Sequence, residues 1–192
     1  MRRMSLLVWF APLLLSAGCA SNKALQSAST GDVPDWYSTL PQDPNYLFAV
    51  ASATSQDMQL AIDKAVVNAR TEIARQTEVK VSSIQKRFDE EVGAADNAQL
   101  MQQFSQATKT VVSTSLTGSR VRSQKTAKDG TIWRGYVLVE YPIGAASQAL
   151  LNQIKGNGQM YTEFKATQAY KELDDEVQKY EDWKKNQATP MK

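Results

Sequence analysis

The chain has 192 residues, with 22 Lys and Arg against 20 Asp and Glu, which gives a formal net charge of +2. It contains no histidine and a single cysteine. These counts exclude an intrachain disulfide, a zinc site of the ordinary type and any catalysis that depends on histidine. The near balance of charge also leaves nucleic-acid binding without its usual electrostatic support.

The chain begins with the three parts of a secretory leader in their usual order. Two arginines supply positive charge, residues 6–15 form an uncharged apolar run, and the small residues 16–18 lead to Cys19. An apolar run of about ten residues is too short to cross a bilayer core of roughly 30 Å, but it suits a signal peptide. We therefore predict a signal peptide over residues 1–18.

Cys19 follows this leader directly and resembles the cysteine of a bacterial lipobox, although Ser16 stands where leucine is usual. We predict cleavage between Gly18 and Cys19 and lipidation of the Cys19 thiol. Two or three acyl chains there would anchor the protein without a membrane-spanning helix. The alternative, a buried free thiol, fits a cysteine at the end of an apolar leader poorly. Removing Arg2 and Arg3 with the leader lowers the 22 basic residues to 20, equal to the 20 acidic ones, so the mature chain is neutral.

The residues after the cysteine predict a spacer before the folded part. Residues 21–32 are rich in Ser, Ala and polar residues and show no apolar period, so we expect a lipidated flexible tether over residues 19–32. A chain of about a dozen such residues has an r.m.s. reach of roughly 20 Å. Folding is predicted to begin near Val33, where Trp36 and Tyr37 precede two prolines that fix an extended segment.

A strand and a long helix are predicted next. Residues 46–53 form a short apolar run typical of a buried strand. Thr54 or Ser55 then offers an N-cap for a helix that should end near Gln76. The apolar stripe of this helix has helical spacing and consists of Ile62, Ala65, Val66, Ala69 and Ile73. The alternation that follows predicts a second strand over residues 78–87.

A second helix and a hairpin come after it. Residues 95–116 carry apolar residues at helical spacing, namely Leu100, Phe104, Ala107 and Val111. Residues 120–128 and 131–141 are predicted to pair across Asp129-Gly130, a dipeptide that fits a type I′ turn. Both faces of the segment 131–141 are largely apolar, which predicts a central strand covered on both sides.

The C-terminal part is predicted to be helical. We expect a short helix over residues 144–155, a flexible joint at 156–158, and a charged helix from Met160 to about Lys185. The last helix carries an apolar stripe that would either dock on the protein's own domain or pair with another chain; its members are Tyr170, Leu173, Val177 and Tyr180. The whole order (βαβαββ) predicts an α+β fold with a small mixed sheet packed by two long helices, plus a C-terminal amphipathic helix.

The sequence offers little from which to build an active site. It holds no P-loop, no Gly-x-Gly-x-x-Gly and no Gly-x-Ser-x-Gly. The carboxylates of Asp89, Glu90 and Glu91 could bind a cation weakly or form a solvated turn. Aromatic residues could line a ligand groove or pack as ordinary core; they are Trp36, Tyr37, Trp133, Tyr136 and Tyr141. We therefore predict no enzyme, no cofactor and no metal site.

Three segments together resemble the LPP-twenty lipoprotein family. They are residues 34–37 (Pro-Asp-Trp-Tyr), the strand over residues 46–53, and a helix over residues 61–74 with an Ala-x-x-x-Ala-x-x-x-Ala-Arg pattern. The resemblance covers roughly residues 33–142 and leaves residues 143–192 as a helical C-terminal extension. It implies an outer-membrane-anchored lipoprotein with a small α+β domain and no known enzymatic site. Some relatives build rings or disks around the flagellar motor, and others are surface antigens.

Two functional hypotheses follow. The preferred one is a periplasm-facing outer-membrane lipoprotein whose non-catalytic domain binds envelope proteins or copies of itself, with a flagella-associated role as one form. Ala20 favours the outer membrane, because an aspartate after the lipidated cysteine typically retains lipoproteins in the inner membrane. The alternative is an envelope carrier or sensor that binds a small apolar or glycan ligand between sheet and helices. An enzyme that uses carboxylates alone has the least support, and no nucleic-acid partner is expected.

Overall fold

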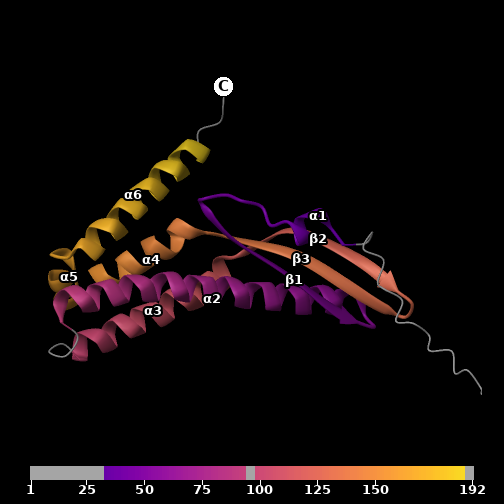
Figure 1. Cartoon of the computed structure of the whole chain (residues 1–192), viewed down its shortest axis with the longest axis horizontal. Coiled ribbons are helices and arrows are strands. Elements are labelled where there is room, and N and C mark those ends of the chain that lie inside the picture. Colours follow the sequence, from indigo (N-terminus) through magenta and orange to yellow (C-terminus); the bar gives the residue numbers. More distant parts are fainter. Residues whose placement is uncertain (1–32, 94–97, 189–192) are drawn as a thin grey trace, which may run out of the picture. The chain divides into compact units, whose positions relative to one another are not determined.

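The computed structural model describes residues 33–93 and 98–188 (Figure 1). In chain order its elements are α1 (Asp35–Ser38), β1 (Tyr46–Ser55), α2 (Met58–Val92), α3 (Ala98–Gly118), β2 (Arg120–Asp129), β3 (Ile132–Pro142), α4 (Ile143–Lys155), α5 (Gly158–Lys165) and α6 (Gln168–Ala188). The predicted signal peptide, the Gly18–Cys19 cleavage and lipidation site and the tether lie outside the described residues and stay predictions.

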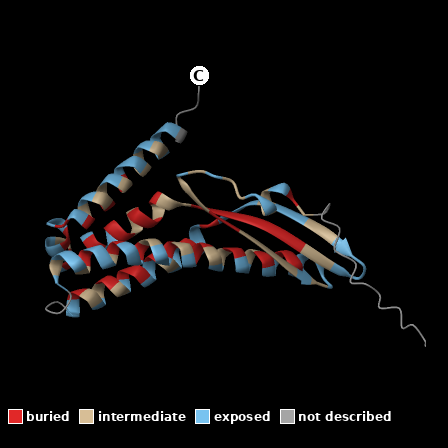
Figure 2. Ribbon diagram, in the orientation of Figure 1, coloured by how far each residue is buried: buried red, intermediate tan, exposed pale blue. Residues whose placement is uncertain are grey.

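The sheet is antiparallel, with β3 between β1 and β2. The α+β class and the central position of β3 are confirmed, but the predicted mixed sheet is wrong. Strand β3 is buried from Gly135 to Tyr141 (Figure 2). Helix α2 packs against β1 and β3 on one face of the sheet. On the other face, the Tyr37 ring of α1 meets the Tyr136 ring of β3 at 5.1 Å.

The predicted strand over residues 78–87 is also wrong, because helix α2 runs without a break from Met58 to Val92. Val81, Ile84 and Phe88 are buried at helical spacing, whereas Val79 is 60% exposed. The alternation that suggested a strand therefore comes from one solvent-facing and one core-facing residue of a helix. Without this strand the predicted βαβαββ order is lost, and the described strands form only antiparallel pairs.

Helix α2 approaches the sheet through small side chains. Ala61, Ala65 and Ala69 are each fully buried. A Cβ atom at Gly135 of β3 would lie 3.0 Å from the backbone carbonyl of Ala61 and from the backbone nitrogen of Ile62. A side chain at this position would therefore have to push the helix away from the sheet, and glycine allows the close contact.

Helix α2 begins slightly later than predicted. Strand β1 continues through Ser55, so neither Thr54 nor Ser55 is the N-cap. Asp57 takes this role: its carboxylate accepts a hydrogen bond of 2.7 Å from the backbone N–H of Leu60. An ionised cap also interacts favourably with the positive end of the helix dipole.

The hairpin between β2 and β3 is present, but its turn differs from the predicted one. Asp129 pairs with Ile132, so the two loop residues are Gly130 and Thr131. Gly130 has a φ of 59°, and no described residue other than glycine has a positive φ. This pattern agrees with a type II′ turn, which needs glycine at its first central position. The predicted type I′ turn needs a positive φ at both positions.

The C-terminal segment folds as three helices, because the predicted helix over residues 160–185 is divided into α5 and α6. The Asn157 side chain caps α5 within the predicted joint. The carboxylate of Glu91, at the end of α2, accepts hydrogen bonds of 2.7 and 3.1 Å from the backbone N–H groups of Gln168 and Ala169. Glu91 therefore satisfies the free N–H groups at the start of α6.

One hydrophobic core joins the sheet to the helices of the described chain. The rings of Phe88, Phe104 and Phe164, from α2, α3 and α5, pack at centroid distances of 5.7, 5.0 and 5.8 Å. Leu150 of α4 and Leu173 of α6 belong to the same core. The core therefore crosses residue 142, where the sequence suggested that the domain passes into a C-terminal extension.

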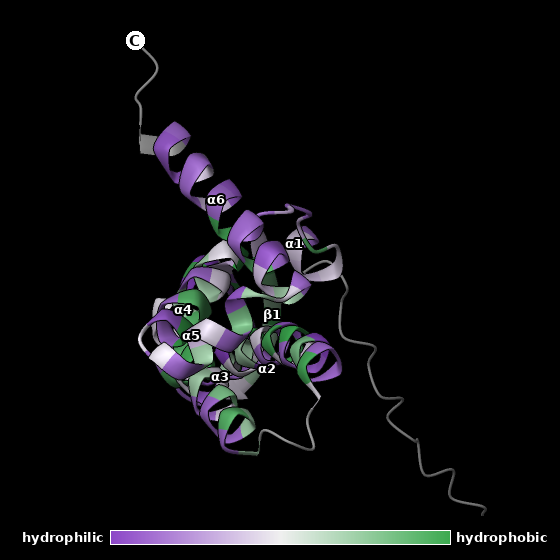
Figure 3. Ribbon diagram, turned by 90° about the vertical axis from the view of Figure 1, so that its left-hand side faces the viewer, coloured by the Kyte–Doolittle hydropathy of each residue, from purple (hydrophilic) through white to green (hydrophobic). Residues whose placement is uncertain are grey.

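Helix α6 is hydrophilic along most of its length (Figure 3). Its hydrophobic residues Leu173 and Val177 are buried. None of the helices in the described ranges is long and apolar enough to cross a bilayer.

Candidate interaction surfaces

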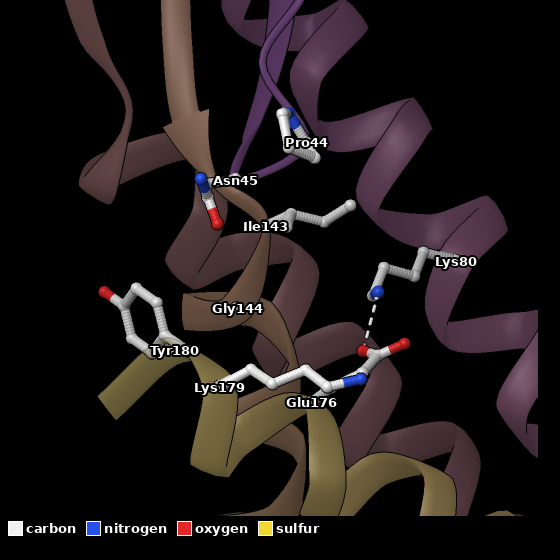
Figure 4. A pocket seen from close by; sticks show the side chains of 8 residues that line it. All are labelled: Pro44, Asn45, Lys80, Ile143, Gly144, Glu176, Lys179 and Tyr180. Atoms are coloured by element: carbon white, nitrogen blue, oxygen red, sulfur yellow. Dashed lines mark ion pairs between the residues drawn. The ribbon is translucent and has the colours of Figure 1, made fainter. Parts of the chain in front are cut away.

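A surface pocket of about 350 Å³ lies where the segment before β1 meets α2, α4 and α6 (Figure 4). Figure 4 shows the Lys80 and Glu176 side chains pointing toward each other from α2 and α6. The lining residues are Pro44, Asn45, Lys80, Ile143, Gly144, Glu176, Lys179 and Tyr180. The pocket therefore lies at the junction between α6 and the rest of the domain.

Glu176 is the centre of the polar contacts in this pocket. Lys80 Nζ lies 2.7 Å from its carboxylate, and Ser147 Oγ donates a hydrogen bond to it at 2.7 Å. Burial by itself would raise the pKa of Glu176. Hydrogen bonds from Lys80 and Ser147, with the charges of Lys80 and Arg87, outweigh burial and lower this pKa from its ordinary value of 4.5. A carboxylate held ionised in this way is poorly suited to act as a general acid, and it ties α6 to α2 and α4.

We expect Glu176→Gln to destabilise the protein at neutral pH by about 1 kcal/mol, because the charge-assisted contact with Lys80 is lost. The folded-state pKa is lowered, so this contribution is present above the ordinary pKa of 4.5 and is lost as the pH falls through the lowered value. Thermal melts of both proteins across this range should show the difference in Tm closing in acid. A difference that persists in acid would contradict the assignment.

Helix α6 crosses α4 at Gly144. A Cβ atom there would lie 2.4 Å from both Cβ and Cγ of Tyr180, so no side chain fits between the two helices. The Tyr180 ring stacks on Trp183 at 5.6 Å, and Trp183 meets Tyr46 edge-on at 5.5 Å. These contacts fix the C-terminal half of α6 against the start of β1.

Gly144→Ala should destabilise the protein by about 1–3 kcal/mol, because the added methyl group forces α4 and α6 apart. Gly158→Ala is the matched control, since an added Cβ at the start of α5 meets nothing within 4 Å. We expect that control to be neutral or slightly stabilising. Urea denaturation of the two variants measures the difference, and equal stability would show that α6 does not pack on Gly144 in solution.

The aromatic residues that could have lined one ligand groove lie in different parts of the domain. Trp36 and Tyr37 belong to α1 and pack on the face that carries Tyr136. Tyr141 is buried on the opposite face, where burial raises the pKa of its phenol to about 12. Trp133 lies at the hairpin end of β3. This distribution favours ordinary packing over a shared groove.

The acidic residues at the end of α2 do not converge on a cation, and they lie on a helix instead of the predicted turn. Glu91 caps α6, and Glu90 lies 3.8 Å from Lys86 Nζ. Burial, together with the charge of Glu90, raises the pKa of Asp89. Within residues 33–93 and 98–188, no group of three or more His, Cys, Asp or Glu side chains is placed to hold a metal ion.

The apolar stripe of α6 docks on the protein's own domain, which is one of the two alternatives left open by the sequence. Leu173 and Val177 are buried. The Tyr170 ring packs edge-on against Phe164 of α5 at 5.8 Å. The stripe therefore contributes to the core, and it is not a free surface for another chain.

An apolar groove lies on the solvent side of α2, beside β1. Its volume is about 420 Å³, and its lining is Ala53, Leu60, Asp63, Lys64, Val67 and Asn68. Leu60 and Val67 are 46% and 62% exposed. No pattern in the sequence was interpreted as this groove, although the spacing of seven residues between Leu60 and Val67 places both on one helix face.

A second groove, of about 400 Å³, runs between α3 and the α4–α5 link and is lined mainly by amides. The amide side chains come from Gln103, Gln106, Asn152, Gln153 and Asn157. The side-chain oxygen of Gln103 is buried without a hydrogen-bond partner. Amides that both donate and accept hydrogen bonds suit ligands rich in hydroxyl groups.

A family model described as LPP20 lipoprotein matches residues 34–141. The matched region begins just before α1 and ends in β3, so it contains the whole sheet apart from the last residue of β3, together with α2 and α3. Helices α4, α5 and α6 lie outside it. No curated protein matches the chain.

Proposed function

The chain belongs to the LPP20 lipoprotein family, and from this we propose that it is anchored in the outer membrane through a lipid on Cys19 and acts by binding envelope proteins or copies of itself. The family match supports the lipoprotein class. The predicted leader that ends at the only cysteine supports the attachment point. Ala20 supports the outer membrane. A domain that faces the periplasm is part of this proposal. A flagella-associated structure is one assembly in which such a protein would serve.

The observation that carries this proposal is the combination of a family domain with a leader that ends at the sole cysteine of the chain. The described domain adds support, because two of its carboxylates have structural partners. Glu176 is held by Lys80 and Ser147, and Glu91 caps α6. These contacts favour a binding or structural role for the domain over a catalytic one.

Cys19→Ser should abolish acylation, because the serine hydroxyl does not replace the thiol in lipid transfer. We expect complete loss of labelled palmitate from the protein and its release from the membrane fraction, or its retention as an uncleaved precursor. Ser16→Leu is the matched control, since it completes the usual lipobox and should remain labelled. Wild-type protein that keeps its leader, or that is soluble with a free thiol, would overturn the anchor.

The apolar groove beside α2 is the surface that we propose for protein contacts. Its exposed residues Leu60 and Val67 are flanked by the charged residues Asp63 and Lys64. An apolar centre with a polar rim is the usual anatomy of a protein interface. The Tyr170 and Tyr180 stripe is less suitable, because it packs within the domain.

A photo-crosslinking amino acid at Val67 should give one discrete product in intact cells, identified by mass spectrometry as an envelope protein or a second copy of the chain. The same amino acid at Ser113, an exposed position on α3, serves as the control and should give no such product. A Leu60→Glu change should remove the product, because it places a charge in the contact. Equal products from positions 67 and 113 would exclude this groove.

The second hypothesis, an envelope carrier or sensor, has one structural argument in its favour. The amide-lined groove contains the unpartnered oxygen of Gln103 and suits a glycan better than an apolar ligand. The ligand site predicted between the sheet and the helices is less favourable, because core side chains such as Ile73, Val137 and Val139 fill that space. We therefore rank this function second.

A further inference from the structure

Positive charge is concentrated in the β2–β3 hairpin. Residues 120–142 contain five basic residues against two acidic ones, Asp129 and Glu140, whereas the mature chain is neutral. The basic residues are Arg120, Arg122, Lys125, Lys128 and Arg134. The hairpin therefore has a net positive charge that the rest of the mature chain balances.

Most of this charge faces solvent. The side chains of Arg120 and Arg122 are 67% and 46% exposed, and Lys125 is exposed. Glu140, whose side chain is 7% exposed, accepts contacts from both arginines at 2.7 and 3.1 Å. One carboxylate thus balances only one of two guanidinium groups, and both keep donors available for an external anion.

The pairing register places these groups on one face of the sheet. Arg120 lies opposite Glu140, and Lys125 lies opposite Tyr136. Directly opposed residues of an antiparallel pair point to the same side, and alternate residues of β3 share a side. Arg134 therefore lies on the side of Tyr136 and Glu140. We call this side, which faces away from α2, the basic face.

Helix α1 packs on the basic face. The Tyr37 ring of α1 packs against Tyr136 at 5.1 Å, and its hydroxyl donates a hydrogen bond of 3.2 Å to Ser52 Oγ. Fourteen positions separate Cys19 from Val33, the first residue that the structure describes. A flexible segment of this length has an r.m.s. reach of roughly 20 Å. The proposed lipid on Cys19 would therefore hold α1, which packs on this face, within reach of the membrane surface.

A further β-strand would pair poorly with the edge of the sheet that carries the basic face. Strand β2 is an edge strand with a register shift between Val121 and Ser123. Such irregularities and edge lysines or arginines oppose the addition of a further strand. A second copy would also bring the same positive charge to the contact. An anionic lipid surface needs no strand pairing and matches the sign of the charge.

We propose that the basic face binds the phosphate groups of anionic phospholipids, such as phosphatidylglycerol, in the leaflet that holds the anchor. This inference rests on the proposed lipid anchor at Cys19, which determines that the face meets a membrane. Guanidinium groups donate paired hydrogen bonds to phosphate oxygens, and lysine adds a point charge. The partly exposed Trp36 of α1 lies beside the face and suits the headgroup region.

The test uses the mature chain, residues 19–192, with Cys19→Ser, so that it carries no acyl group. Co-sedimentation is measured with two kinds of vesicle. One is pure phosphatidylcholine, and in the other phosphatidylglycerol makes up about one quarter of the lipid. We expect binding only to the anionic vesicles, with an affinity that falls steeply as added salt shortens the Debye length to about 8 Å. Since no acyl group is present, the result is independent of whether Cys19 is lipidated in cells.

Charge variants connect the binding to the basic face. Lys125→Gln combined with Arg134→Gln should weaken binding to anionic vesicles by about thirtyfold, given the usual effect of each basic residue near such a surface. Lys155→Gln combined with Lys171→Gln removes the same charge from α4 and α6, and we expect less than a twofold effect. Thermal melts confirm that both variants fold.

Three results would overturn the inference. The first is equal binding to neutral and anionic vesicles. The second is equal weakening by the two double variants, which would assign the binding to net charge alone. The third is a hairpin variant that loses self-association but keeps its vesicle affinity, because the face would then bind protein. Loss of palmitate labelling in wild-type cells would refute the anchor without changing the vesicle result.

Discussion

The close approach of helix α2 to strand β3 is the contact on which the rest of the structure depends. Three alanines of the helix are fully buried, and a Cβ atom at Gly135 of the strand would lie 3.0 Å from the helix backbone. Because α2 also carries Phe88, at the far end of the helix, the same element builds the second part of the core with α3 and α5. A helix displaced at Gly135 would therefore disturb both regions.

The features that could be predicted from the sequence are those with a local cause. Periodicity predicts the apolar stripe from Ile62 to Ile73 and the central position of β3. Turn chemistry predicts the hairpin at Gly130. The strand assigned to residues 78–87 failed because two valines two positions apart fit a strand and a long helix equally well. Only the continued burial of Ile84 and Phe88 shows that the helical period persists.

The surfaces were harder to predict, because they depend on which elements meet. Nothing local in the sequence marks Gly144 as the contact for Tyr180, since the two residues belong to different helices. The pairing of Lys80 with Glu176 likewise joins residues far apart in the chain. The charge of the hairpin is visible in the sequence, but its concentration on one face depends on the strand register and on the position of α1.

Helix α2 has 35 residues and contains neither glycine nor proline. At 1.5 Å per residue, it is about 52 Å long. Its N-terminal part packs on the sheet, and its C-terminal residue Glu91 caps α6, so one uninterrupted rod connects the two regions. A force applied at one end would be transmitted along its axis without a hinge to absorb it. The two ends of the domain are therefore held at a fixed separation.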